Sequence, residues 1–187
     1  MRKLFIIFIF LQVIFTSYCN AQSNELFTAQ SRLLIQWEDG KGKLMEAYTE
    51  SSNMTLSLST GEFVLKADLS TLKTANLSLD SLIKSKGSQQ LIYKGKLSAD
   101  NLYIFTQHVN DEKDYFIEGQ LSINSKSTPG VAIYNPTNFS EKSDNKKFRM
   151  NFELIVSPSK ITILGLENFI NKQLIFKIIN GPLNTQP

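Results

Sequence analysis

The sequence contains one cysteine, one histidine and one tryptophan, and the scarcity of the first two excludes several kinds of site. A chain with a single cysteine forms no internal disulfide, so packing alone must hold its fold together. The sole histidine, His108, has no cysteine, nucleophile-elbow serine or second histidine to work with, which makes it a surface residue rather than a catalytic or metal-binding one. The sequence also lacks a phosphate-cradling glycine loop. The chain is therefore not expected to be an enzyme, and no cofactor or metal is expected.

A strong charge of either sign is also missing. Lys and Arg together number 20 against 17 Asp and Glu, which gives a formal net charge of +3. Two of the basic residues, Arg2 and Lys3, lie in a segment that we expect to be removed, so the rest of the chain is nearly neutral. No dense basic cluster is present either. Nucleic acid is therefore not an expected partner.

Residues 1–21 have the pattern of a secretory signal. Arg2 and Lys3 form a positive start, residues 4–15 are almost unbroken apolar sequence, and residues 17–21 are a polar exit with small side chains. The apolar run is too short for a permanent membrane span, so we expect cleavage after Ala21 and no transmembrane segment in the mature chain. The alternative is lipid attachment at Cys19, but the bulky Tyr18 precedes it where lipoprotein signals have a small residue. The mature protein, residues 22–187, is expected to be periplasmic or secreted.

Short runs of alternating apolar and polar residues recur along the mature chain, with turn signals between them. The clearest runs from Phe148 to Val156, where every second residue is apolar. Eight to ten such runs at roughly ten-residue spacing predict one all-β domain, an antiparallel barrel or sandwich. The expected strands cover residues 33–37, 44–49, 54–58, 63–69, 91–97, 102–109, 115–123, 148–156, 161–164 and 174–179. Pro129-Gly130 and residues 135–147 are expected to form polar loops.

The stretch from Gly61 to Gly87 combines a strand with a short helix. Alternation from Phe63 to Leu69 predicts a half-buried strand. After it, Ser78 is a candidate N-cap for a helix whose Leu79, Leu82 and Ile83 share one face. Lysines in the last turn and Gly87 mark the end of this helix.

Two acidic segments could suggest a metal site. Asp111, Glu112 and Asp114 resemble half of a calcium loop, but the glycine and the terminal glutamate of that motif are missing. Glu38-Asp39 lies between two apolar runs. Both segments are therefore interpreted as solvated turns.

Two motifs resemble those of a known family. The segment Thr74 to Asp80, TANLSLD, resembles the Thr-Gly-Asn-x-x-Arg-Asp signature of the YceI-like family, and residues 63–70 are similar to the strand that leads into it. Gly119 to Ser125, GQLSINS, with Pro129 further on, resembles the family's Gly-x-Leu-Thr-Ile-His-Gly segment and its following proline. The resemblance spans about residues 56–129. It implies an exported lipocalin-like barrel with one or two short helices that binds polyisoprenoid lipids.

The sequence departs from the family pattern at three positions. Leu79 stands where the family has arginine, Asn124 replaces the histidine, and Ser125 replaces the glycine. A histidine-containing pattern expected near the N-terminus is also absent. If those polar residues hold a ligand's head group in relatives, this chain lacks that contact.

The expected function is to hold an apolar, lipid-like molecule inside the barrel. An eight-stranded barrel can enclose one small ligand, and burial of hydrocarbon can drive its binding without specific polar contacts. The residues expected to line the cavity are Phe63, Leu65, Tyr115, Ile117, Phe148, Met150, Phe152 and Leu154. The main alternative is a barrel whose interior is filled by these side chains and whose loops serve as an envelope or surface interaction module. Alternation of apolar residues is the same in both cases.

Overall fold

The computed structural model describes residues 26–106, 114–142 and 145–185, and describes only the backbone of residues 26–29, 104–106, 136–142, 145–149, 180 and 182–185. The strands are β1 Leu26–Glu38, β2 Leu44–Ser57, β3 Glu62–Asp68, β4 Lys73–Thr74, β5 Gln90–Lys96, β6 Tyr115–Ile123, β7 Lys126–Lys142, β8 Asn145–Val156 and β9 Leu174–Thr185. The helices are η1 Leu69–Thr71, α2 Leu77–Ser85 and α3 Ala99–Thr106.

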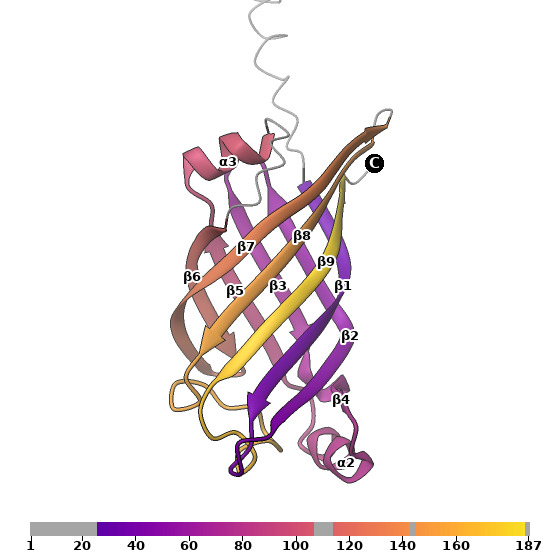
Figure 1. The fold of residues 1–187 in the computed structure, drawn as a ribbon, viewed down its shortest axis with the longest axis vertical. Coiled ribbons are helices and arrows are strands. Elements are labelled where there is room, and N and C mark those ends of the chain that lie inside the picture. Colours follow the sequence, from indigo (N-terminus) through magenta and orange to yellow (C-terminus); the bar gives the residue numbers. More distant parts are fainter. Residues whose placement is uncertain (1–25, 107–113, 143–144, 186–187) are drawn as a thin grey trace, which may run out of the picture.

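The sheet closes into an antiparallel barrel of eight strands. Its order is β1-β9-β8-β7-β6-β5-β3-β2, the pairing of β1 with β2 completes the circle, and the two-residue β4 adds to β2. Figure 1 shows α3 at one end of the barrel and α2 with the loop between β8 and β9 at the other. The barrel fold is confirmed, and the sandwich alternative is excluded.

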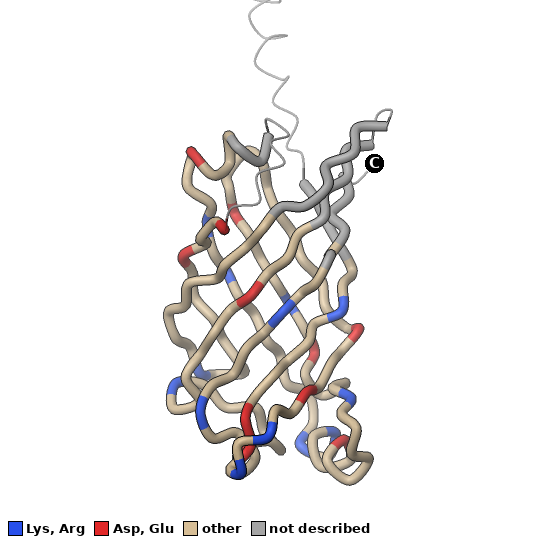
Figure 2. Tube along the Cα trace, viewed as in Figure 1, with Lys and Arg blue, Asp and Glu red and all other residues tan. Residues whose placement is uncertain are grey.

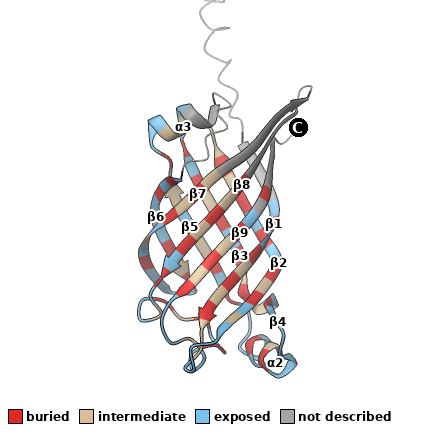
Figure 3. Ribbon diagram, viewed as in Figure 1, coloured by how far each residue is buried: buried red, intermediate tan, exposed pale blue. Residues whose placement is uncertain are grey.

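Burial alternates along the strands as the sequence pattern predicts. In β6, Tyr115, Ile117, Leu121 and Ile123 are buried and their neighbours are exposed or half-buried. The same alternation appears as bands along the other strands in Figure 3. Figure 2 shows that acidic and basic residues are both distributed along the strands and loops of the barrel. The period of two therefore separates an apolar interior from a polar outer face.

The expected strand at residues 102–109 is wrong, because residues 99–106 form the helix α3. The hydroxyl of Ser98 accepts a hydrogen bond from the backbone N–H of Asn101 at 3.2 Å, and its carbonyl accepts one from Leu102 at 2.9 Å. Ser98 thus caps the helix, and this local start signal outweighs the apolar character of the residues that follow. Residues 107–109, with His108, lie outside the described residues.

The expected polar loop at residues 135–147 is also wrong. Residues 135–142 continue β7 and residues 145–147 begin β8, and the two strands pair as far as Lys142 and Asn145. Pro129 and Gly130 lie inside β7, opposite Gln120 and Gly119. Polar composition did not break these strands because their pairing resumes after a register shift between Thr137 and Ser140 and continues to the end of the hairpin.

Other expected strands also differ from those of the structure, and β1 and β9 are longer than predicted. Residues 44–49 and 54–58 belong largely to the single strand β2, which passes a register shift in its pairing with β1 instead of a turn. Residues 161–164 are not a strand, although Ile161 and Ile163 are buried. Apolar side chains there pack over the end of the barrel without joining its ladder.

The helix after β3 begins two residues earlier than expected. Asn76, not Ser78, is the N-cap, because its side-chain Oδ1 accepts the backbone N–H of Ser78 at 3.0 Å and of Leu79 at 3.3 Å. Leu79 and Ile83 are buried, whereas Leu82 is 39% exposed. The predicted end is confirmed, since Gly87 follows the helix with a φ of +80°.

Candidate functional site

The residues expected to line a cavity converge on the barrel interior. Phe63, Leu65 and Ile117 have no exposed surface, and Tyr115 is 8% exposed. Met150, Phe152 and Leu154 on β8 are each 1% exposed. The backbone of Phe148 belongs to β8, but its side chain is not among those that the structure describes. The described residues of this set therefore lie in one interior. A side chain beside a void large enough for water would keep some accessible surface, and these side chains keep almost none. The interior around them is therefore filled.

Three aromatic rings meet in the middle of the barrel. Phe63 and Phe152 stack with their ring centroids 5.5 Å apart and their planes at 22°. Tyr93 meets Phe152 edge-on at 5.6 Å and lies 6.3 Å from Phe63. Since β3 and β8 are four strands apart in either direction around the barrel, Phe63 and Phe152 span its full width. We call Phe63, Tyr93 and Phe152 the aromatic layer.

Tyr93 lies over a row of glycines in the wall. Gly95, Gly119 and Gly130 stand opposite one another on β5, β6 and β7. A Cβ at Gly119 would lie 2.8 Å from Tyr93 Cζ, so the missing side chain makes room for the ring. The Tyr93 hydroxyl donates its one proton to the Ile117 carbonyl, and the Gly130 carbonyl oxygen lies 3.3 Å from the same hydroxyl. Tyr93 was not among the residues predicted to line the interior, although its place in the alternation of β5 was a usable signal.

The end of the barrel near α2 is filled and sealed. Leu79 and Ile83 of α2 and Ile161, Ile163 and Leu166 of the β8–β9 loop are all buried there. The buried side chain of Gln89 fixes this loop, because its Nε2 donates to the Leu164 carbonyl at 3.0 Å and its Oε1 accepts the Leu164 N–H at 2.8 Å. This end therefore acts as a solid core.

The opposite end, near α3, contains a pair of tyrosines. Tyr115 and Tyr134 contact each other there, with ring centroids 5.3 Å apart, and burial raises the pKa of Tyr134. On the wall formed by β1 and β2, the buried Ser52 hydroxyl donates to the Ser31 carbonyl. The buried polar side chains of the described residues are Ser31, Thr49, Ser52, Gln89 and Thr128, and none of the buried side chains in these residues is charged. The described interior could not neutralise a charged ligand.

The polar residues of the first family-like motif are used within the chain itself. Asp80 Oδ1 accepts hydrogen bonds from the backbone N–H of Thr74 at 2.7 Å and from its hydroxyl at 2.6 Å. Asn76 caps α2, and Leu79, at the position of the family arginine, is buried against the sealed end. The motif therefore fastens α2 to the barrel.

The second motif ends in a hairpin turn. Asn124 has a φ of 54°, which suits asparagine better than most residues, and Ser125 completes the turn between β6 and β7. The Asn124 Oδ1 accepts the backbone N–H of Gln90 at 3.2 Å, and the Asn124 backbone N–H donates to the Gln90 carbonyl at 3.0 Å. Asn124 thus ties the turn to β5 at the sealed end.

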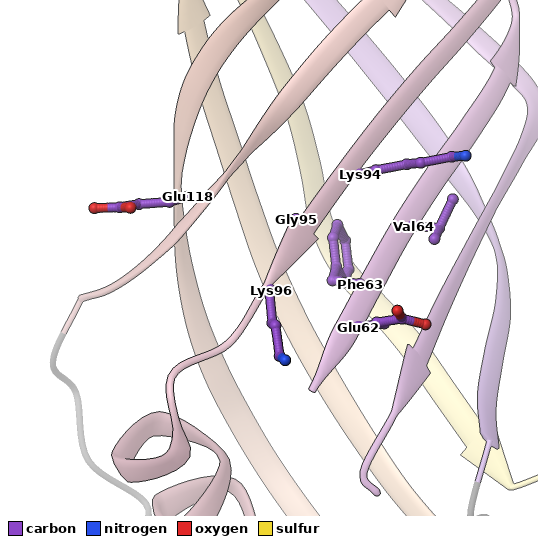
Figure 4. A pocket seen from close by; sticks show the side chains of 7 residues that line it. All are labelled: Glu62, Phe63, Val64, Lys94, Gly95, Lys96 and Glu118. Carbon is purple, nitrogen blue, oxygen red and sulfur yellow. The ribbon is translucent and has the colours of Figure 1, made fainter. Parts of the chain in front are cut away.

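The hollows on the barrel surface include two that are lined by described residues. One of about 390 Å³ is lined by Glu62, Phe63, Val64, Lys94, Gly95, Lys96 and Glu118. Figure 4 shows its charged side chains pointing in different directions rather than toward one point. The second, of about 470 Å³, lies over β7, β8 and β9 and includes the Glu153–Lys177 ion pair at 3.1 Å. Neither hollow brings together an acid, a base and a nucleophile in the manner of a catalytic site.

The acidic turns do not form a metal site in the described residues. Asp39 Oδ1 accepts the backbone N–H groups of Lys41 and Lys43, and these hydrogen bonds lower the pKa of its carboxyl. Glu38 forms an ion pair with Lys172 at 2.6 Å. Asp111 and Glu112 lie outside the described residues, and Asp114 is exposed. No cluster of three or more potential ligands occurs within the described ranges, and no helix in these ranges is long and apolar enough to cross a membrane.

Comparison with solved structures identifies the fold. A polyisoprenoid-binding domain from Saccharophagus degradans, described as implicated in plant cell wall breakdown, superposes with a TM-score of 0.65 at 12% identity. The match covers 88% of this chain and 100% of that domain. BcnA from Burkholderia cenocepacia superposes with a TM-score of 0.53 at 10% identity, covering 83% of this chain and 96% of that protein. No family model and no curated protein matches the sequence. The chain therefore has the lipocalin-like barrel fold of these proteins, and the fold implied by the YceI-like motifs is confirmed.

Proposed function

We propose that the mature chain is an exported, non-enzymatic binding protein that holds an apolar ligand with a hydrocarbon chain, of the polyisoprenoid type, in its barrel. The observation that carries this proposal is the match to a polyisoprenoid-binding domain over that domain's whole length. The apolar interior supports it, because each buried methylene of a ligand contributes about 0.8 kcal/mol. The lack of a catalytic constellation in the described residues supports a non-enzymatic role.

The ligand enters from the α3 end in this proposal, because the other end is sealed by α2 and the β8–β9 loop. Its chain lies against the side chains near Tyr115 and Met150 and displaces part of their present packing. Since the buried side chains of the described residues carry no charge, a charged head group would have to stay at the mouth of the barrel, in water. Affinity then depends on the chain and little on the head.

A second candidate is an interaction module with a filled barrel. Two observations favour it: the described interior side chains keep almost no accessible surface, and Phe116, Val131 and Ile155 on the outer face are 57%, 51% and 48% exposed. Exposed apolar side chains that gather on one face are typical of surfaces that bind another protein. In this case the barrel serves as a rigid support and holds no ligand.

Titration of the delipidated chain with alcohols distinguishes the two candidates. The probes are isoprenols and straight-chain primary alcohols of increasing length, followed by the matching phosphates, each measured by displacement of a fluorescent apolar probe. A ligand-binding barrel gains about fourfold in affinity for each added methylene until the site is full, with little difference between alcohol and phosphate. Lack of binding at every length supports the filled module. Binding of phosphates alone points instead to a basic site, for which Lys73, Lys84 and Lys86 near α2 are the candidates.

A further inference from the structure

The aromatic layer divides the barrel interior into two parts. Phe63 projects from β3 and Phe152 from the opposite strand β8, and their stacked rings bridge the interior at a centroid distance of 5.5 Å. Tyr93 projects into the interior from a third strand, β5, and its ring centroid lies 5.6 Å from that of Phe152. Because the rings come from three strands and touch in the middle, no hydrocarbon chain can pass between them.

Tyr93 is anchored at both its ring and its hydroxyl. Its hydroxyl donates to the carbonyl of Ile117, and its ring is seated over the glycine row, within 2.8 Å of where a Cβ at Gly119 would lie. Rotation of the ring would leave the hydroxyl without this hydrogen bond inside an apolar core, which is costly. The Tyr93 side of the layer is therefore the least able to yield to a ligand.

The space between the aromatic layer and the sealed end is occupied. Leu65 and Leu154 follow Phe63 and Phe152 toward that end on the same strands, and Phe176 stands opposite Leu154 on β9. Leu65, Phe176 and Leu91 have no exposed surface, and Leu154 is 1% exposed. This half of the interior behaves as a packed core, in which extra volume would strain the structure.

We infer that Phe63, Tyr93 and Phe152 form the floor of the ligand site and set the longest chain that the barrel can enclose. This inference rests on the proposed function. From Phe152, β8 extends seven residues toward the α3 end, to Asn145. With about 3.3 Å per residue and a tilt of about 40°, this wall rises roughly 18 Å above the floor. On the opposite side β3 begins only one residue before Phe63, so the fully enclosed part of the ligand is shorter than this wall. A longer ligand leaves the rest of its chain outside, where it adds nothing to affinity.

Chain-length profiles of floor variants test the inference. The full chain is delipidated and titrated with straight-chain primary alcohols of increasing length, and the length at which affinity stops rising is recorded for each variant. Phe152→Ala removes a ring from the floor, so we expect the plateau to move to chains longer by about three carbons, with about fourfold tighter binding for each added carbon. Phe152→Leu opens less space and moves the plateau by about one carbon.

Phe176→Ala is the matched control. It removes the same ring from an equally buried position below the floor, so it lowers stability in a similar way and leaves the plateau where it was. If Phe152→Ala does not fold, the plateau lengths of Phe152→Leu and Phe63→Leu test the inference instead. A shift in the floor variants but not in the Phe176 control supports the inference.

Two results overturn the inference in different ways. In the first, the parent protein binds alcohols, but the Phe152 and Phe63 variants reach their plateau at the same chain length as the parent, or the Phe176 control shifts by as much as they do. The floor is then wrong and the proposed function stands. If the parent binds no alcohol of any length, the proposed function fails and the floor fails with it.

Discussion

The ring of Tyr93 fills the space that a side chain at Gly119 would need. A Cβ on Gly119 would lie 2.8 Å from Tyr93 Cζ, and also 2.3 Å from the Lys94 carbonyl oxygen and 2.7 Å from the Gly95 Cα. Two of these neighbours are backbone atoms, which cannot rotate away. The glycine row is therefore a requirement of the packed interior, and Gly119 is expected to resist even the smallest substitution.

Gly119→Ala is accordingly expected to destabilise the protein by about 3 kcal/mol, because overpacking here must move the β5 backbone. Gly40→Ala is its control, since no atom lies within 4 Å of a Cβ at residue 40. Urea unfolding curves of both variants measure the difference. Equal stability of the two variants would mean that the glycine row is not closely packed.

Phe152→Asp is expected to cost several kcal/mol, since it removes a buried ring and places an unpaired charge among apolar side chains. Ile155→Asp makes a comparable change on the outer face of the same strand, where Ile155 is 48% exposed, and is expected to cost about 1 kcal/mol or less. Chemical denaturation compares the two. Similar losses would show that the two faces of β8 have been assigned wrongly.

The cap of α2 can be tested with two neighbouring residues. Asn76→Ala is expected to cost about 1 kcal/mol, because it removes the acceptor of two helix N–H groups. Ser78→Ala removes an exposed hydroxyl from the first turn and is expected to change stability by about 0.5 kcal/mol or less. The free energies of unfolding of the two variants decide between them. A larger loss at residue 78 would restore the cap expected from the sequence.

Stability is expected to fall at alkaline pH through the buried tyrosines. Burial raises the pKa of Tyr93 from its ordinary value of 10.0 to about 12. In the unfolded chain the phenol loses its proton near pH 10, whereas in the folded protein it keeps the proton. The stabilising contribution is thus complete below about pH 10 and is lost as the pH rises toward 12.

Urea unfolding between pH 8 and pH 11.5 measures this loss. Tyr93→Phe is expected to be less stable than the parent at pH 8, since it removes the hydrogen bond from the buried hydroxyl to the Ile117 carbonyl, and to lose less stability above pH 10. Tyr103→Phe, at a side chain that is 65% exposed, is the control for the substitution itself. A pH profile of Tyr93→Phe parallel to that of the parent would argue against the raised pKa.

Export is expected to remove residues 1–21 without adding lipid. The mature N-terminus should then read Gln-Ser-Asn-Glu, from Gln22 onward. N-terminal sequencing and the intact mass of the exported protein check this. A mass increment of a diacylglyceryl group on Cys19 would instead support the lipoprotein alternative.

The alternation of side chains was enough to predict an antiparallel barrel or sandwich, the strand β6 with both its ends, and the inward face of β8. The choice of a barrel came from the resemblance to the YceI-like motifs. Period-two burial is a local property, because successive side chains of a strand point to opposite faces whatever strand lies next to it. The end of α2 at Gly87 was likewise predictable, since a helix stop depends on one residue's backbone freedom. The helix α3 and the long β7–β8 hairpin were not predicted, because capping by Ser98 and ladder pairing outweighed local composition there.

The state of the interior depends on contacts that no local pattern contains. Phe63 and Phe152 lie far apart in the sequence and meet only because the closed barrel places β3 opposite β8. The glycines at 95, 119 and 130 become one row only through the registers of β5, β6 and β7. An apolar residue on an inward face looks the same in sequence whether it borders a cavity or fills one. Strand order, register and closure bring these rings together, and that long-range geometry makes the middle of this barrel solid.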